Sequence, residues 1–344
     1  MVVRLAAFIS FALISMAQAE PLLVKDAQIA ALKADAKFTR SLLRKCDTEL
    51  AAPTHAVADF APAPHYTDQG SRPDDDQATG LTGDIRRAYR AALCYRLSAR
   101  AAYAGQTQTI VDAWAGTMKS ASNAQGRSDI NFNIAQLVVA ASWVESVNGW
   151  NAASFKAWLS KVIAPLSLSS APNNRGNWGN LQDVAIAAFI SDKPALATAA
   201  ARWQALLTSE VAGDGTLPLE ICRSNSSDHC GGPDKGVNGL AYTHYALLPA
   251  AIAGEILEAQ GQKSFRSPSG GSFAKAFQKT VAFTENPALF PYYAANNGHL
   301  NKIDHCAYFA LAAQHFPNEN ARAVLSAGTC KSDIWMLQKL FGVN

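Results

Sequence analysis

"INFNIAQLVVAASWVESV", residues 130–147, indicates the fold class of this chain. Its apolar side chains recur at helical spacing, and one stripe of the helix carries Ile134, Leu137, Val138, Ala141 and Val144. Strict strand alternation is nearly absent from the chain, and alanine-rich faces let helices approach closely. The sequence therefore predicts an all-α protein.

Helical patterns also cover most of the remaining sequence. We expect helices near 25–49, 83–105, 106–123, 151–165, 178–192, 193–213, 237–260, 271–284, 303–315 and 331–341. About twelve helices joined by short loops predict stacked helical hairpins, arranged as an open bundle, a solenoid or an α/α toroid. The sequence has no sharp repeat of fixed length, which argues mildly against a regular solenoid. No Gly/Ser-rich linker divides the chain, so we expect one domain over residues 20–344.

The amino terminus has the pattern of a secretory signal. Arg4 precedes an apolar run over 5–16, and Ala17-Gln18-Ala19 is a small-residue cleavage site. The run is too short to cross a bilayer comfortably, although an uncleaved membrane anchor is the alternative. We predict a signal peptide at 1–19 and a periplasmic or secreted monomer that has no membrane association after cleavage.

Charge and cysteine content narrow the functional classes. The chain has 30 Lys and Arg residues against 27 Asp and Glu residues, which gives no argument for a nucleic-acid partner but permits local positive patches. An even number of cysteines in an exported chain indicates disulfides. The simplest pairs are Cys222–Cys230, Cys306–Cys330 and Cys46–Cys94, although spacing alone leaves other connectivities open.

The sequence offers no good metal site. No CxxC motif stands near a histidine pair, as a zinc site would require. "RPDDDQ" at 72–77 is more typical of a solvated acidic loop than of a calcium site. We expect neither a metal nor a cofactor.

Four less regular stretches are the places to look for function, at 51–80, 166–177, 213–236 and 285–302. In the second, "NNRGNW" at 173–178 precedes a helical run that begins at Trp178. Backbone donors at a helix N-terminus favour an anion. The alternative is that Asn174 or Asn177 is an N-cap and Arg175 makes a surface salt bridge.

Two further motifs follow. "GDGTLPLE" at 213–220 is a turn whose Glu220 is either a structural hydrogen-bond acceptor or a direct participant. In "NGLAYTHYALLPA" at 238–250, Tyr242 and Tyr245 share one helical face. Core packing is the ordinary reason for such a pair, and a lone His244 is more often structural than a base.

In combination, the three motifs resemble those of the alginate lyase family. An asparagine pair before a tryptophan-led helix, a "DGxLPxE" turn and an "LAYxxYAL" helix are similar to the helical lyases of polysaccharide lyase family 5 and, in more detail, to the broader polyuronate lyases of family 38. The resemblance covers about 170–260. It implies an incomplete α/α toroid with a substrate groove or tunnel. It also implies β-elimination of a 1,4-linked acidic polysaccharide such as alginate or glucuronan.

This chain departs from the family 5 pattern at three points. Arg175 stands where that family has a histidine, and Asn238 stands where it has an arginine seven positions before its tyrosine acid, which matches Tyr245. A cysteine-bracketed insertion at 222–230 interrupts the segment. These differences favour the broader relatives.

The chemistry of a uronate lyase assigns roles to these residues. The carboxylate beside C5 must be neutralised before the C5 proton can leave, and amides with a guanidinium can do this. When the proton and the leaving O4 lie on one face, a single tyrosine serves as base and acid. We therefore predict Tyr245 as acid and base, with Asn174 and Arg175 neutralising the carboxylate. Further substrate-binding candidates are Asn173, Trp178, Tyr242, His244, Lys235, His229 and His65.

Some roles stay open. A base on the opposite face would come from His65, His229 or His299. Trp143, Trp150 and Trp178 are either sugar platforms or core residues, and His65 with Tyr66 is a candidate lid.

Two other functional classes compete with the lyase. A catalytically silent uronate-binding relative is consistent with the changes at Arg175 and Asn238. A helical glycoside hydrolase would need two opposed carboxylates, for which Asp183, Asp214 and Glu220 are available.

Overall fold

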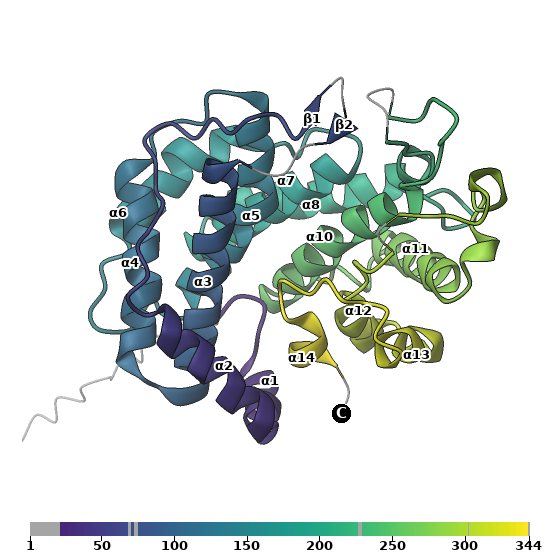
Figure 1. The fold of residues 1–344 in the computed structure, drawn as a ribbon. Coiled ribbons are helices and arrows are strands. Elements are labelled where there is room, and N and C mark those ends of the chain that lie inside the picture. The colour runs from purple at the N-terminus through teal and green to yellow at the C-terminus, as the bar shows by residue number, and fades with distance from the viewer. Residues whose placement is uncertain (1–20, 68–69, 72–74, 226–228, 302, 343–344) are drawn as a thin grey trace, which may run out of the picture.

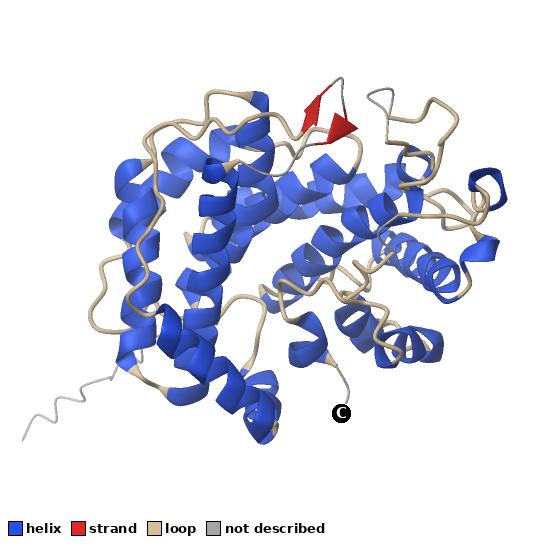
Figure 2. Cartoon of the chain, viewed as in Figure 1, coloured by secondary structure: helices blue, strands red, loops and turns tan. Residues whose placement is uncertain are grey.

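The computed structural model describes residues 21–67, 70–71, 75–225, 229–301 and 303–342. This part of the chain is helical apart from loops and one small hairpin (Figure 2). The fold is an incomplete α/α toroid, as predicted. Its inner helices neighbour one another in chain order around the ring (Figure 1): α3 (Asp76–Ser98), α5 (Ala124–Ser142), α7 (Asn174–Phe189), α10 (Gly239–Ala259) and α12 (Phe309–His315).

A second layer of helices packs outside this ring. Its members are α4 (Ala101–Thr117), α8 (Lys193–Glu210), α11 (Pro268–Glu285) and α13 (Glu319–Ser326), together with α6 (Ala153–Trp158) and its continuation η1 (Leu159–Ile163) and η2 (Ala164–Leu166). Shorter elements complete the structure: α1 (Asp26–Ala34), α2 (Ala36–Glu49), α9 (Pro218–Ile221), η3 (Pro287–Leu289), η4 (Ala294–Asn296), α14 (Leu337–Phe341) and the antiparallel pair β1 (Tyr66–Thr67) and β2 (Gly70–Ser71).

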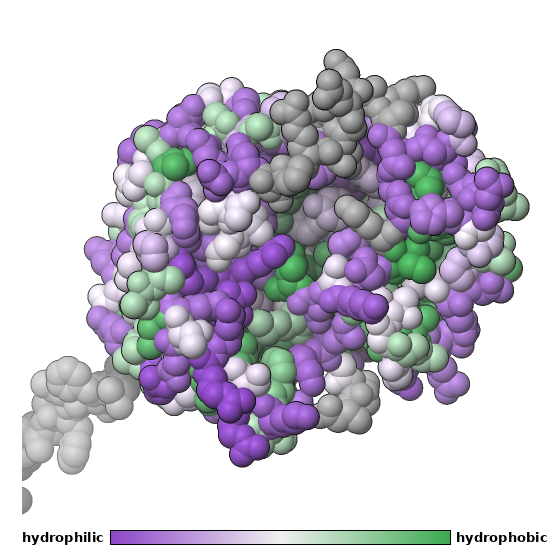
Figure 3. Space-filling model, viewed as in Figure 1, coloured by the Kyte–Doolittle hydropathy of each residue, from purple (hydrophilic) through white to green (hydrophobic). Residues whose placement is uncertain are grey.

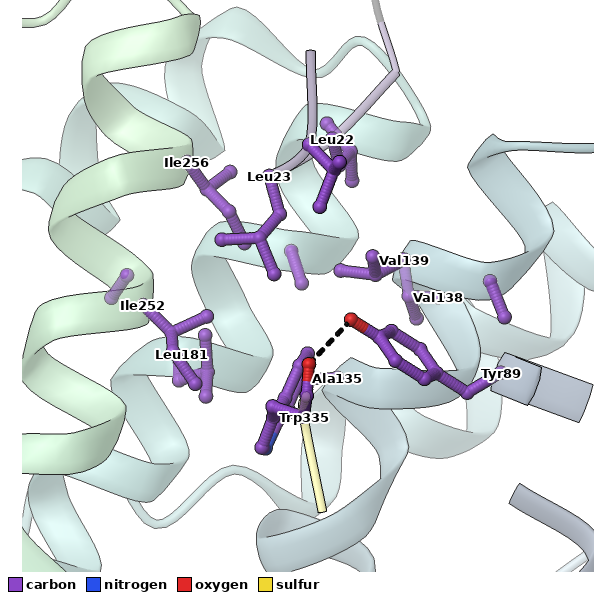
Figure 4. Close-up of a cluster of buried hydrophobic side chains, with 14 of the residues drawn as sticks. Leu22, Leu23, Tyr89, Ala135, Val138, Val139, Leu181, Ile252, Ile256 and Trp335 are labelled. Atoms are coloured by element: carbon purple, nitrogen blue, oxygen red, sulfur yellow. Dashed lines mark hydrogen bonds between the residues drawn. The ribbon is translucent and has the colours of Figure 1, made fainter. Parts of the chain in front are cut away.

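The C-terminal segment fills the inner side of the ring. The Tyr89 hydroxyl donates to the carbonyl oxygen of Trp335 at 3.0 Å (Figure 4). The side-chain amide of Gln136 donates to the carbonyl oxygen of Ile334 at 2.7 Å. Trp335 is 1% exposed and meets Tyr89 edge to face. The same core joins α5, α7 and α10 through Val138, Leu181 and Ile252 (Figure 4), so apolar burial holds the inner helices together.

Several expected helix boundaries are wrong. The helix expected at 83–105 breaks at Ala99, which has a left-handed φ of 57°, and Gly105 lies inside α4. The helix expected at 25–49 breaks at Asp35, whose side chain accepts from Phe38 N and caps α2. The expectation for 303–315 and 331–341 placed too much helix there and missed α13 between them.

The long loop ends earlier than expected, because α3 begins at Asp76. Buried Asp84 anchors this loop to the ring. It accepts from His55 N at 2.7 Å, contacts His55 Nδ1 at 2.9 Å, and accepts from Trp114 Nε1 at 3.0 Å. Arg87 pairs with the same carboxylate at 2.7 Å and also donates to Pro53 O. Pro53 and His55 of this loop are therefore held against α3.

All three expected disulfides are confirmed: Cys46–Cys94, Cys222–Cys230 and Cys306–Cys330. Within the described ranges, no helix is long and apolar enough to span a membrane. The predicted signal peptide at 1–19 lies outside the described residues.

Candidate active site

A pocket of about 540 Å³ opens on the inner side of the toroid. Figure 3 shows this face hollowed near its middle. The walls come from the N-terminal parts of α3, α5, α7 and α10, and from the C-terminal segment. Polar and aromatic residues that line the pocket include His65, Arg86, Asp129, Phe132, Asn133, Asn174, Arg175, Trp178, Arg223, His229, Tyr242, Tyr245, His305, Asp333 and Trp335.

The "NNRGNW" stretch forms the first turn of α7. Asn173 is the N-cap, because its side chain accepts from Arg175 N at 3.1 Å, so the expectation that Asn174 or Asn177 caps the helix is wrong. The helix starts at Asn174, ahead of the expected Trp178. Gly176 lets this turn approach the preceding loop, since a Cβ there would collide with the carbonyl oxygen of Ala171. Asn174, Arg175 and Trp178 thereby face the pocket.

The hydrogen-bond acceptor at this helix N-terminus belongs to the protein itself. Glu220, 1% exposed, accepts from Asn174 N at 2.6 Å, as the structural-acceptor alternative for this residue predicts. Asn174 Nδ2 also lies 3.0 Å from each oxygen of Glu220. The two hydrogens of an amide point about 120° apart, whereas the two oxygens of one carboxylate lie close together, so both contacts use the same hydrogen. The second amide hydrogen is left for another acceptor.

A second buried carboxyl lies behind the first. Burial raises the pKa of Glu220 to about 7, against hydrogen bonds from Asn174 and the charge of Arg223. Burial raises the pKa of Glu210 to about 8, opposed by its 2.6 Å hydrogen bond from Asn177 and reinforced by the neighbouring Glu220. Burial of both carboxyls, together with the repulsion of Glu210 by Glu220, favours a retained proton on the pair near neutral pH.

Tyr245 stands in an aromatic wall. Its half-buried ring lies 5.2 Å from that of Trp178 and 5.6 Å from that of Phe132. The Tyr242 ring is 6.4 Å away on the same helical face. All four side chains line the pocket, so the tyrosine pair is not simply core packing.

Cationic side chains approach from several elements. Arg175 is exposed at the start of α7, and Arg86 lies on α3. Arg223 places its guanidinium carbon 4.3 Å from the centre of the Tyr242 ring. His65, His229 and His305 add three imidazoles to the lining. The three guanidinium groups are suited to an acidic ligand.

Other expected site residues lie elsewhere. Asn173 is occupied in capping α7 and does not line the pocket. Lys235 is exposed beside the Tyr292 ring. His244 is fully buried and 3.1 Å from Thr284 Oγ1, and its burial lowers its pKa to about 3. His299 is in a hydrogen bond with Asn301.

Two of the three candidate tryptophans are structural. Trp143 is 4% exposed and donates to Leu22 O, which confirms the core alternative. Trp150 donates to Asp112 away from the pocket. Trp178 lines the pocket.

The carboxylates considered for a hydrolase do not meet in an opposed pair. Asp183 bonds to Ser167 in a groove between η2 and α8. Asp214 accepts from Thr216 in an exposed turn. Glu220 is directed at Asn174. Among the described residues, no three His, Cys, Asp or Glu side chains gather as a metal site requires.

Sequence reasoning missed several lining residues. Arg86, Asn133, Arg223, His305 and Asp333 lie outside the three motifs and reach the pocket through tertiary folding. Of these residues, only Arg223 could have been suspected from the sequence, because it follows Cys222 of the expected disulfide loop.

Comparisons with known proteins give a consistent result. The family model described as alginate lyase matches residues 27–290. An alginate lyase from Bacteroides ovatus has a TM-score of 0.71 at 16% identity, covering 94% of this chain and 99% of that one. Alginate lyase A1-III from Sphingomonas species A1 has a TM-score of 0.63 at 15% identity, covering 88% and 92%. A variant of A1-III complexed with a tetrasaccharide has a TM-score of 0.64 at 16% identity, covering 89% and 93%. At these identities the structures establish the fold, and no curated protein sequence matches the chain.

Proposed function

The chain belongs to the alginate lyase family and is a polysaccharide lyase, and from this premise we propose that it cleaves 1,4-linked polyuronates, alginate first among them, by β-elimination. The observation that carries the proposal is the shared pocket of Asn174, Arg175 and Tyr245, backed by Glu220. Two variants of alginate lyase A1-III, which has the same fold, are known in complex with a tetrasaccharide. An acidic oligosaccharide also suits the cations around the pocket.

In the proposed reaction, Asn174 and Arg175 neutralise the substrate carboxylate. Glu220 fixes the Asn174 amide in one orientation, which leaves its second hydrogen for a carboxylate oxygen. Arg175 adds a full positive charge from an exposed position at the pocket edge. Preorganised donors of this kind stabilise the charge that develops when the C5 proton departs.

Tyr245 performs both proton transfers. As the phenolate it removes the proton from C5, and the electron pair of that C–H bond forms the C4=C5 double bond. The C4–O4 bond breaks, and O4 leaves with its electron pair and takes the proton from the Tyr245 hydroxyl. The tyrosine returns to the phenolate, so no external reactant is consumed.

The cellular setting is also part of the proposal. We infer that residues 1–19 are a signal peptide and that one lyase domain, 20–344, acts as a monomer in the periplasm or outside the cell. Three disulfides support this inference, because disulfides persist in oxidising compartments.

The test is a substrate panel. The mature protein is incubated with polymannuronate, polyguluronate and glucuronan, while the ultraviolet absorbance of the new double bond and the number of reducing ends are followed. The proposal predicts that both rise together on at least one polymer. Reducing ends without the double bond would indicate a hydrolase, and binding without product would indicate a silent relative. Because Arg175 in place of a histidine favours the broader polyuronate lyases, we propose glucuronan as the second candidate substrate after alginate.

A further inference from the structure

The loop closed by the Cys222–Cys230 disulfide brings a guanidinium and an imidazole to the pocket. Arg223 follows the first cysteine, His229 precedes the second, and both line the pocket. Backbone hydrogen bonds define the described part of this loop: Ser224 N donates to His229 O at 2.7 Å, and Gly236 N to Cys222 O at 3.0 Å. Arg223 therefore enters the pocket from an ordered backbone.

Asn238 holds this loop against the start of α10. Its backbone N–H donates to Arg223 O at 2.9 Å. Its side-chain amide donates to Ser224 O at 3.2 Å and to Asn225 Oδ1 at 2.6 Å. The Asn238 side-chain oxygen in turn accepts from Asn301 Nδ2 at 3.0 Å. This residue, at the position where family 5 has an arginine, thus fixes the segment that carries Arg223.

The Arg223 guanidinium lies in the same pocket as Tyr242 and Tyr245. It stacks on Tyr242, one helical turn from Tyr245, and its charge acts on the buried Glu220. Its Nε is buried and has no hydrogen-bond partner among the described residues. A stacked guanidinium keeps its edge available for two parallel hydrogen bonds to a carboxylate.

We propose that Arg223 is a catalytic residue whose guanidinium binds the carboxylate of the reacting uronate beside Asn174, and that Asn238 and the Cys222–Cys230 disulfide are its positioning elements. The inference rests on the proposed lyase function. On this proposal, Arg223 of the disulfide-closed loop takes the role of the arginine that family 5 has at the position of Asn238.

The test compares alginate oligosaccharides with the same oligosaccharides carrying methyl-esterified carboxyl groups. For each enzyme form, kcat/KM is measured on both substrates. Arg223→Gln is expected to lose about 100-fold on the free acid, because one charged donor is removed from the developing enolate. The loss on the ester is expected to be at least tenfold smaller, since the ester presents no full charge to the guanidinium.

Three further variants separate this role from a structural one. Arg322→Gln removes an exposed arginine of α13 and is expected to match the parent on both substrates. Asn238→Ala and the double variant Cys222→Ser/Cys230→Ser, each checked for a parent-like melting curve, are expected to reduce the preference for the free acid in the same direction as Arg223→Gln.

The outcomes are distinct. An active parent whose Arg223→Gln variant loses activity equally on both substrates, or loses none, would overturn the inference while leaving the proposed function in place. A parent that forms no unsaturated product from any polyuronate would overturn the proposed function and this inference with it.

Discussion

At the scale of single residues, the buried carboxyl of Glu220 changes the interpretation of the α7 N-terminus. A polar turn before a helix suggests that backbone N–H groups receive an external anion. Here Asn173 and Glu220 occupy those donors, so side chains rather than backbone face the pocket. The Asn174 amide is held by a neighbour that accepts from it twice, which makes its orientation a property of the protein rather than of the ligand.

Asn174→Asp tests this orientation without a change in size. The new carboxylate would face both Glu220 and the substrate carboxylate, so charge repulsion should lower kcat/KM by more than about 100-fold. Steady-state kinetics on alginate oligosaccharides provide the measurement. Asn151→Asp, at an exposed loop position, is the matched control and should behave like the parent. Parent-like kinetics for Asn174→Asp would remove Asn174 from the mechanism.

The raised pKa of Glu210 should make the free energy of unfolding depend on pH. Its pKa is raised from 4.5 to about 8, so the folded protein keeps a proton that the unfolded chain has already lost. The stabilisation is complete below about pH 4.5 and is lost as pH rises through about 8. Thermal melting of Glu210→Gln should therefore depend less on pH between 5 and 8 than that of the parent. Glu319→Gln, at an exposed glutamate, should keep the parent's dependence, and identical slopes for all three would refute the assignment.

Among the candidate residues, those that local motifs carry were found together in one pocket. Asn174, Arg175, Trp178, Tyr242 and Tyr245 line one pocket because each follows from a helix start or a helical face. Arg86 and His305 could not be found this way, because their place depends on how distant helices pack around the ring. The prediction that His244 binds substrate was wrong for a related reason, since its side chain on α10 is buried in the core.

At the scale of elements, the irregular segments are held by buried polar contacts. Asp84, with no exposed surface, ties the loop before α3 to α3 and α4 through His55, Arg87 and Trp114. This set of contacts was not visible in the sequence, since His55 and Trp114 lie 29 and 30 residues from Asp84. Helix ends were likewise hard to place: Ala99 adopts a left-handed conformation without a glycine to mark it.

Asp84→Asn should destabilise the protein by about 3 kcal/mol, because it leaves the buried Arg87 charge without its partner. Chemical denaturation gives the free energy of unfolding. Asp26→Asn breaks the surface pair with Arg96, in which Asp26 is 98% exposed, and should cost under about 1 kcal/mol. Equal losses for the two variants would show that the Asp84 network is not a buried anchor.

At the scale of the whole molecule, the ring and its closure create the pocket. The helical period predicted the all-α class correctly, since it depends only on local pattern, whereas the toroid was predicted from the resemblance to the alginate lyase family. The contact of Trp335 with Tyr89 of α3, which links the C-terminal segment to the first inner helix, was not predicted. A contact between residues far apart in the chain produces no periodic pattern in the sequence. The C-terminal segment brings His305 and Asp333 to the pocket, and the Cys306–Cys330 disulfide joins its two parts.

Trp335→Ala should cost about 3 kcal/mol or more, since a large buried ring leaves a cavity against Tyr89. It should also raise KM for long oligosaccharides, because this residue and its neighbours form one wall of the pocket. Denaturation and kinetics on oligomers of different length measure the two effects. Unchanged stability would contradict the closing role of this segment.

The proposed β-elimination depends most on Tyr245, which we propose carries both proton transfers. The most direct measurement is the rate of unsaturated-product formation from alginate oligosaccharides by the parent, Tyr245→Phe and the control Tyr95→Phe, which lies on α3 outside the pocket lining. We expect Tyr245→Phe to bind the oligosaccharide but to form product at least about 1,000-fold more slowly, and Tyr95→Phe to match the parent. Product formation by Tyr245→Phe at the parent's rate would contradict this proposal.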